Sequence, residues 1–342
     1  MNAIVEQRPV AHLLNRGFDV SLVLAPALLG LLALAVVTHN PGLFVLILLA
    51  DLWLLGYHHV IATYLRLGLD ASTRTRHMSL WLLLPAMLAV VGLAAWLVGV
   101  WLVATVYFFW QWFHYVRQSW GIALVLRGNS GAAAKLDRFD QSVFWLVPLA
   151  GILWRSAEQH AQFLGAELWT PAIPKPAALV VVTVAALATL MWLRRCWQRR
   201  KTETHLGTVF IATHLAMFAV GYIATSNIDH GWLAINIWHN LQYLLFVYAF
   251  NRRRYRQGVE HESRILSWVS QPNRAIAYFL LSGALTLAIY EIGLYFAFSL
   301  SEIGIAGLVV VFQAINFHHY VADSKIWKLR EPSLASTLKA GS

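Results

Sequence analysis

Ten apolar segments of about 20 residues follow one another along the 342-residue chain, with short polar stretches between them. A segment of this length crosses about 30 Å of hydrocarbon as an α-helix. Hydrophobic residues make up 59% of the sequence and charged residues 12%, which lies outside the range of soluble domains. The sequence therefore predicts an all-α fold, a polytopic integral membrane helix bundle. The expected spans are 20–37, 43–65, 80–97, 101–126, 141–157, 177–193, 206–225, 231–250, 276–298 and 304–324.

The positions of the basic residues predict how the bundle is oriented. The N-terminal stretch and every second loop together hold 23 of the 26 Lys and Arg residues. The positive-inside rule makes that side cytoplasmic, so both termini are expected in the cytoplasm, as in a bacterial-type cytoplasmic membrane. The basic clusters at 194–201 and 252–256 flank the expected spans, and no nucleic-acid-binding module accompanies them. They are expected to lie near anionic lipid, and no nucleic acid is expected as a partner.

The chain shows no repeat and no soluble module. Residues 1–330 are therefore expected to form a single membrane domain, and 331–342 a polar, frayed C-terminal tail. The single Cys196 excludes a disulfide within the chain and a cluster of thiolate ligands.

Histidines within the expected spans are the strongest sign of function, because ionisable side chains at bilayer depth are costly. Counting residues along each helix from the nearest basic loop places most of these histidines in or near the cytoplasmic half of the membrane, roughly 10 to 20 Å deep. Helices packed around one cofactor would supply ligands at similar depths, whereas histidines that only bond to a neighbouring helix would not collect there. A spread of about 10 Å requires tilted helices or two metal ions. These histidines are His58, His59, His114, His214, His239, His318 and His319.

Polar residues one helical turn from three of the histidines could orient them. Gln111 precedes His114, Asn236 precedes His239, and Asn316 precedes His319, which Asp323 follows. Such pairs share a helix face, and an acceptor for a ring N–H is what a metal-ligating imidazole needs. On the second span, Asp51 shares the face of His58 two turns later. The pattern predicts a buried metal site with His58, His114, His239 and His319 as preferred ligands and His59, His214 and His318 as alternatives.

Aromatic residues near these positions could line a pocket for a flat, apolar substrate. Tyr107, Trp110 and Trp112 are the expected lining residues, since they lie well within the fourth span. The alternative is that they belong to the aromatic belt of a membrane interface.

The order of the histidines, ending in a late His followed by Asp and a basic stretch, resembles the Brp/Blh-type membrane carotene dioxygenases. The most specific match is His318 with Asp323 five residues later, and His58 or His59, His114 and His239 correspond in order and type. The resemblance implies one iron held by histidines from four helices and cleavage of a polyene within the bilayer. The Pro-His-Gly and His-Phe-Gly signatures of that family do not occur here, and neither do the HxxxH and HxxHH boxes of membrane desaturases.

Together these features predict a membrane-embedded, histidine-ligated non-haem iron oxygenase or oxidase that takes a lipophilic substrate, such as a lipid, from the bilayer and binds one or two ions. The sequence has no flavin or nucleotide motif, so reducing equivalents would come from an external electron donor. Two alternatives stay open: a bis-histidine haem protein for electron transfer, and a metal- or proton-coupled transporter.

Overall fold

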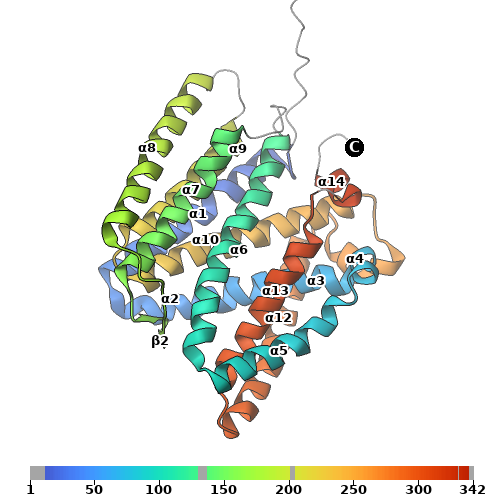
Figure 1. Ribbon diagram of the computed structural model, residues 1–342. Coiled ribbons are helices and arrows are strands. Elements are labelled where there is room, and N and C mark those ends of the chain that lie inside the picture. The colour runs from blue at the N-terminus through green and yellow to red at the C-terminus, as the bar shows by residue number, and fades with distance from the viewer. Residues whose placement is uncertain (1–11, 130–136, 201–204, 330, 339–342) are drawn as a thin grey trace, which may run out of the picture.

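The computed structural model describes residues 12–129, 137–200, 205–329 and 331–338. Helices make up nearly all of this structure, so the all-α prediction is confirmed (Figure 1). The strand pair that it contains is a short hairpin of β1 (Gln162–Phe163) and β2 (Ala166–Glu167). The long helices are α1 (Arg16–His39), α5 (Leu80–Leu97), α6 (Val100–Asn129), α7 (Arg138–Glu158), α8 (Lys175–Arg199), α10 (Ile228–Arg254), α12 (Ala275–Glu302) and α13 (Gly307–Ile326).

Two further long segments are built from helices joined end to end. The first consists of η1 (Pro41–Leu43), α2 (Phe44–Asp51), the π-helix η2 (Leu52–Gly56) and α3 (Tyr57–Leu69), and the second of α9 (His205–Phe218) and the π-helix η3 (Ala219–Ala224). The short helices are α4 (Ala71–Arg76), η4 (His261–Ser263), α11 (Arg264–Val269) and α14 (Pro332–Leu338).

Six helical segments among the described residues are long and apolar enough to cross a membrane, as an integral membrane protein requires. They are Arg16–His39, Pro41–Leu69, Leu80–Leu97, Lys175–Arg199, Leu206–Ala224 and Ala275–Glu302. The other four predicted spans coincide with α6, α7, α10 and α13, whose sequences contain more polar side chains. That these four also cross the membrane, and that both termini are cytoplasmic, stay predictions.

Helix α10 forms the centre of the bundle. Between residues 228 and 251, every side chain is buried except Asp229, Leu241 and Leu245. Helix α10 packs against α1, η3, α3 and α6. A helix enclosed on all sides can keep polar residues in a membrane, because they find partners on the neighbouring helices.

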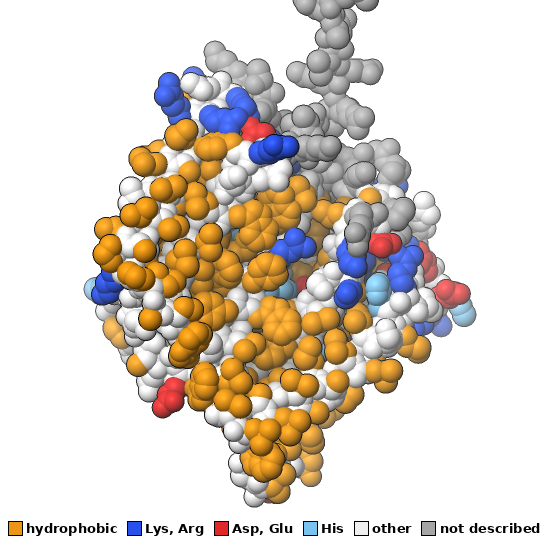
Figure 2. All heavy atoms as spheres, viewed as in Figure 1, with side chains coloured by type: hydrophobic (Ala, Val, Ile, Leu, Met, Phe, Trp, Pro, Cys, Tyr) orange, Lys and Arg blue, Asp and Glu red, His pale blue; other side chains and the backbone are white. Residues whose placement is uncertain are grey.

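The outer helices present apolar side chains instead. Leu82 of α5, Leu187 of α8 and Ile276 of α12 are all more than half exposed. Figure 2 shows that hydrophobic side chains cover most of one face of the molecule. Such an extended apolar surface is expected to contact lipid.

Helices α3, α6, α10 and α13, which carry most of the predicted site, lie together. Helix α3 contacts α10 and α13, and α6 contacts the same two helices. In Figure 1, α8 lies at one edge of the bundle and α5 and α12 at the other, with α6, α10 and α13 between them.

The predicted frayed tail is wrong for the described part of 331–342. Residues Pro332–Leu338 form α14, in which Leu334 and Leu338 are buried. Helix α14 packs against α10, because its two leucines, four residues apart, share one face.

Candidate metal centre

Four histidines from four helices meet inside the bundle: His59 of α3, His114 of α6, His239 of α10 and His319 of α13. All four are buried. Nε2 of His59 lies 2.8 Å from Nε2 of His319. The centre of the His59 ring lies 4.6 Å from the ring centre of His239, 4.7 Å from that of His319 and 6.2 Å from that of His114. The ring of His114 lies 5.0 Å from both His239 and His319.

These distances fit imidazoles around one ion. Suppose that two imidazoles bind one ion through metal–nitrogen bonds of about 2.1 Å. Their ring centres then lie roughly 4.6 Å apart when the two bonds form a right angle, and roughly 6.5 Å apart when the bonds point in opposite directions. Four of the measured separations are close to the first value, and the separation of His59 from His114 is close to the second.

Unpaired nitrogens support the same interpretation. Nδ1 of His59, Nε2 of His114 and Nδ1 of His239 are buried without a hydrogen-bond partner, as are one nitrogen each of His58 and His214 away from the centre. A buried polar atom left unpaired costs about 1–3 kcal/mol. A metal ion would offset this cost for each nitrogen that faces it, so these residues fit a metal site.

The donors fall into two overlapping groups. In His59, His114 and His239, one possible ligand atom from each residue lies within 4.8 Å of the others. The same holds for His114, His319 and Asp323. Because His114 belongs to both groups, the arrangement can hold a single ion or a pair of ions.

Asp323 orients His319 through Thr63. Oγ1 of Thr63 donates to Oδ1 of Asp323 at 2.7 Å and lies 2.9 Å from Nδ1 of His319. Since the one hydroxyl hydrogen of Thr63 is used by Asp323, the oxygen accepts the Nδ1–H of His319. This fixes the tautomer that leaves Nε2 of His319 free for a metal. Tyr243 also donates to Asp323, at 2.8 Å.

Three predicted ligands lie elsewhere. His58 packs edge-on against Phe279 of α12. His318 hydrogen-bonds the Leu80 carbonyl at 2.8 Å and Tyr64 at 2.9 Å. His214 stacks on Phe144 and donates to its carbonyl at 3.1 Å. These three contact neighbouring helices, which is the common role of a histidine in a membrane helix.

A π-helical turn explains why His59 takes the place predicted for His58. In a regular α-helix, residues seven apart lie almost in line, which would align Asp51 with His58. The turn at Leu52–Gly56 is π-helical and takes up one extra residue. Asp51 therefore accepts from Asn236 of α10 at 2.5 Å, and the ring of His59, eight residues later, lies beside that of His239 on the same helix.

The carboxamides do not bind the histidine rings as predicted. Gln111 donates to Asn236 at 3.3 Å and accepts from Trp232 at 2.6 Å. Asn236 also accepts from Tyr115, and Asn316 donates to Gln313 at 3.3 Å. All three carboxamides line a small cavity of about 50 Å³ beside His59, His239 and His319. This space is large enough for a water molecule.

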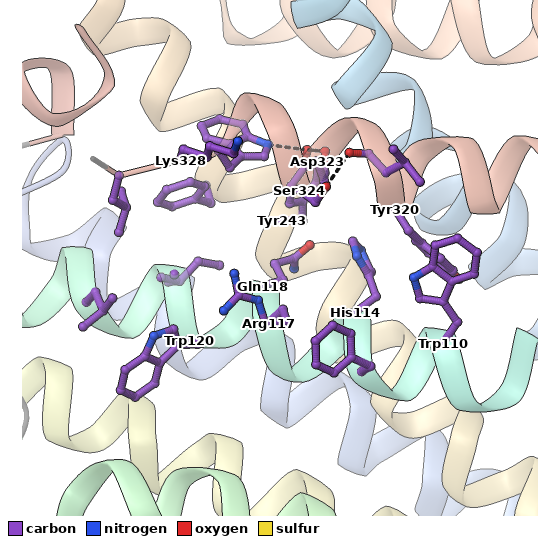
Figure 3. A pocket seen from close by; sticks show the side chains of 18 residues that line it. Trp110, His114, Arg117, Gln118, Trp120, Tyr243, Tyr320, Asp323, Ser324 and Lys328 are labelled. Carbon is purple, nitrogen blue, oxygen red and sulfur yellow. Dashed lines mark hydrogen bonds between the residues drawn. The ribbon is translucent and has the colours of Figure 1, made fainter. Parts of the chain in front are cut away.

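A larger pocket of about 690 Å³ also borders the centre. His114 and Asp323 line it, with Trp110, Phe113 and Trp120 among its apolar walls (Figure 3). Of the three predicted aromatic residues, only Trp110 lines this pocket. Trp112 instead donates to the Pro148 carbonyl at 3.1 Å, and Tyr107 borders the small cavity.

Thr63 and Tyr243 are the site residues that the sequence prediction missed. Each lies four residues after a central histidine, since Thr63 follows His59 and Tyr243 follows His239. That spacing was visible in the sequence, but it could not show which hydroxyl faces Asp323. Comparisons with known proteins found no match to a protein-family model, a curated protein or a solved structure.

Proposed function

We propose that this protein is a membrane-embedded, non-haem iron oxygenase or oxidase that acts on a lipophilic substrate. The observation that carries the proposal is the meeting of His59, His114, His239 and His319 beside a pocket that His114 and Asp323 line. Imidazole is a common ligand of non-haem iron, and Asp323 adds a carboxylate next to the four rings.

The surrounding residues support oxidative chemistry. Bound iron would supply activation of O₂. His114 and Asp323 line the pocket directly, so a substrate lying there would be next to the ion. Thr63 holds His319 in the metal-binding tautomer, and the burial of the four histidines limits the access of water. The Brp/Blh resemblance implies histidines from four helices around one iron, and four helices supply histidines here, which supports the proposal.

The geometry favours an iron ion over a bis-histidine haem. Two axial imidazoles lie on opposite faces of the porphyrin, with their ligating nitrogens about 4 Å apart. Nε2 of His59 and Nε2 of His319 are only 2.8 Å apart, and the other two histidines surround the same point. A porphyrin would have no room between these rings.

The proposal includes a topology and an electron donor. All ten long helical segments would cross a bacterial-type cytoplasmic membrane, with both termini in the cytoplasm, because the basic loops alternate with nearly uncharged ones. Electrons, where the reaction needs them, would come from a partner protein, since the sequence has no flavin or nucleotide motif.

Metal analysis of the detergent-purified protein tests the proposal. We expect iron that survives dialysis, an absorption spectrum without a Soret band, and loss of the iron in His114→Ala. His214→Ala is the matched control, because His214 is also buried but lies outside both donor groups. A Soret band would support the haem alternative, and iron-free protein that takes up metal only transiently would support transport.

A further inference from the structure

Two basic side chains line the large pocket. Arg117 lies on α6, one turn after His114, and Lys328 follows the end of α13. In Figure 3, Arg117 reaches into the space between α6 and α13, and Lys328 lies on the α13 side of that space. In Figure 2, basic, acidic and histidine atoms appear together in the middle of the apolar face.

Neither basic residue has a partner within the part of the chain that the structure describes. The ion pairs and hydrogen bonds of residues 12–129, 137–200, 205–329 and 331–338 include none from the Arg117 or Lys328 side chain. The acidic residue of the pocket is Asp323, whose Oδ1 accepts from Thr63 and Tyr243. The pocket therefore holds two positive charges against one carboxylate that is already hydrogen-bonded.

Arg117 is exposed and Lys328 is partly exposed, so both cations are open to a ligand that supplies the opposite charge. Guanidinium and ammonium groups bind carboxylate and phosphate oxygens through charge-assisted hydrogen bonds. Apolar side chains such as Trp110 and Phe246 make up much of the remaining lining, together with the polar Gln118 and Ser324. Phe113 of the lining is 45% exposed, so the pocket opens onto the apolar outer surface. A ligand that fits both parts has a charged end and a hydrocarbon end.

We infer that the pocket binds a single-chain amphiphile with an anionic head group. The head group lies between Arg117 and Lys328, and the chain passes His114 along Phe113 and Trp110. A volume of about 690 Å³ is in the usual range for such a ligand. That this amphiphile is the substrate rests on the proposed function, whereas its binding does not.

The test measures equilibrium binding of radiolabelled oleate and oleyl alcohol to the full-length protein in a non-ionic detergent. We expect oleate to bind more tightly than the alcohol. Arg117→Gln and Lys328→Gln should each weaken oleate binding by about tenfold, since each removes a charge-assisted contact, and leave alcohol binding within about twofold. Lys325→Gln, an exposed cation on α13 outside the pocket, should change neither.

Two results would overturn the inference. Equal binding of oleate and alcohol, unchanged in Arg117→Gln, would show that the charges do not recognise the ligand. Displacement of oleate by millimolar acetate would indicate a site for small soluble anions instead. Iron content measured on the same samples separates this test from the proposed function: His59→Ala, whose ring lies outside the large pocket, should lose iron and retain oleate.

Discussion

His58 and His59 are neighbours in the chain, yet only His59 faces the other central histidines. His59→Ala should therefore reduce the bound metal to well below half of the wild-type amount, because a ligand is lost. His58→Ala, which removes the same chemical group one position earlier, should keep the metal. Elemental analysis of both purified variants measures the difference. Equal loss from both would mean that the π-helical turn does not set the register as described.

Thr63 connects Asp323 to His319 without being a possible ligand itself. Replacing it with Val keeps the shape of the side chain but removes the acceptor that holds the ring tautomer. We expect the affinity for iron in Thr63→Val to fall by about 10- to 100-fold, as is typical when a partner of a metal ligand is lost. Thr63→Ser keeps the hydroxyl and should restore most of the affinity. Competition with a chelator provides the measurement, and a wild-type affinity in Thr63→Val would contradict this role.

At the scale of elements, the contact between α10 and η3 depends on two glycines. A Cβ atom added at Gly231 would lie 2.0 Å from the carbonyl oxygen of Gly221, so the helix and the π-helical turn could not keep their present distance. Small residues allow this kind of close packing in membranes. Gly231→Ala should lower the apparent melting temperature in detergent by several degrees, since an overpacked contact costs about 1–3 kcal/mol.

Gly283→Ala is the control for this prediction. Gly283 also lies within a long helix, α12, but an added Cβ atom there meets nothing within 4 Å. Thermal unfolding followed by tryptophan fluorescence should find its melting temperature unchanged or slightly higher, because alanine favours helix over glycine. Similar destabilisation by both changes would argue against a specific contact at Gly231.

The positions of the helices could be predicted from the sequence more completely than the arrangement of side chains in the candidate site. Length and hydropathy were enough to place ten helical segments, because each hydrophobic run has to satisfy its backbone in a helix. The π-helical turn at Leu52–Gly56 leaves no comparable sign in apolar sequence, and it decides between His58 and His59. Gln111 and Asn236 have the spacing of residues that orient a histidine, but they bond to each other instead.

At the scale of the whole molecule, polar side chains gather where α3, α6, α10 and α13 meet, and apolar ones cover the outside. Depth along each helix could be estimated from the basic loops. The direction in which each ring points around its helix depends on which helices are neighbours, and that information is in the tertiary packing. The structure brings the rings of His239 and His319 to the same centre, whereas it turns His214 and His318 toward neighbouring helices.

The orientation of the whole bundle leads to a labelling prediction. If both termini are cytoplasmic and each long segment crosses the membrane, the end of α12 at Glu302 is outside and the loop at Glu262 is inside. In a Cys196→Ser background, Glu302→Cys should react with an impermeant maleimide in intact cells, and Glu262→Cys only after lysis. Both residues are exposed, so burial does not explain a difference between them. Reaction of both positions in intact cells would show that α12 does not cross the membrane, and the reverse pattern would invert the proposed topology.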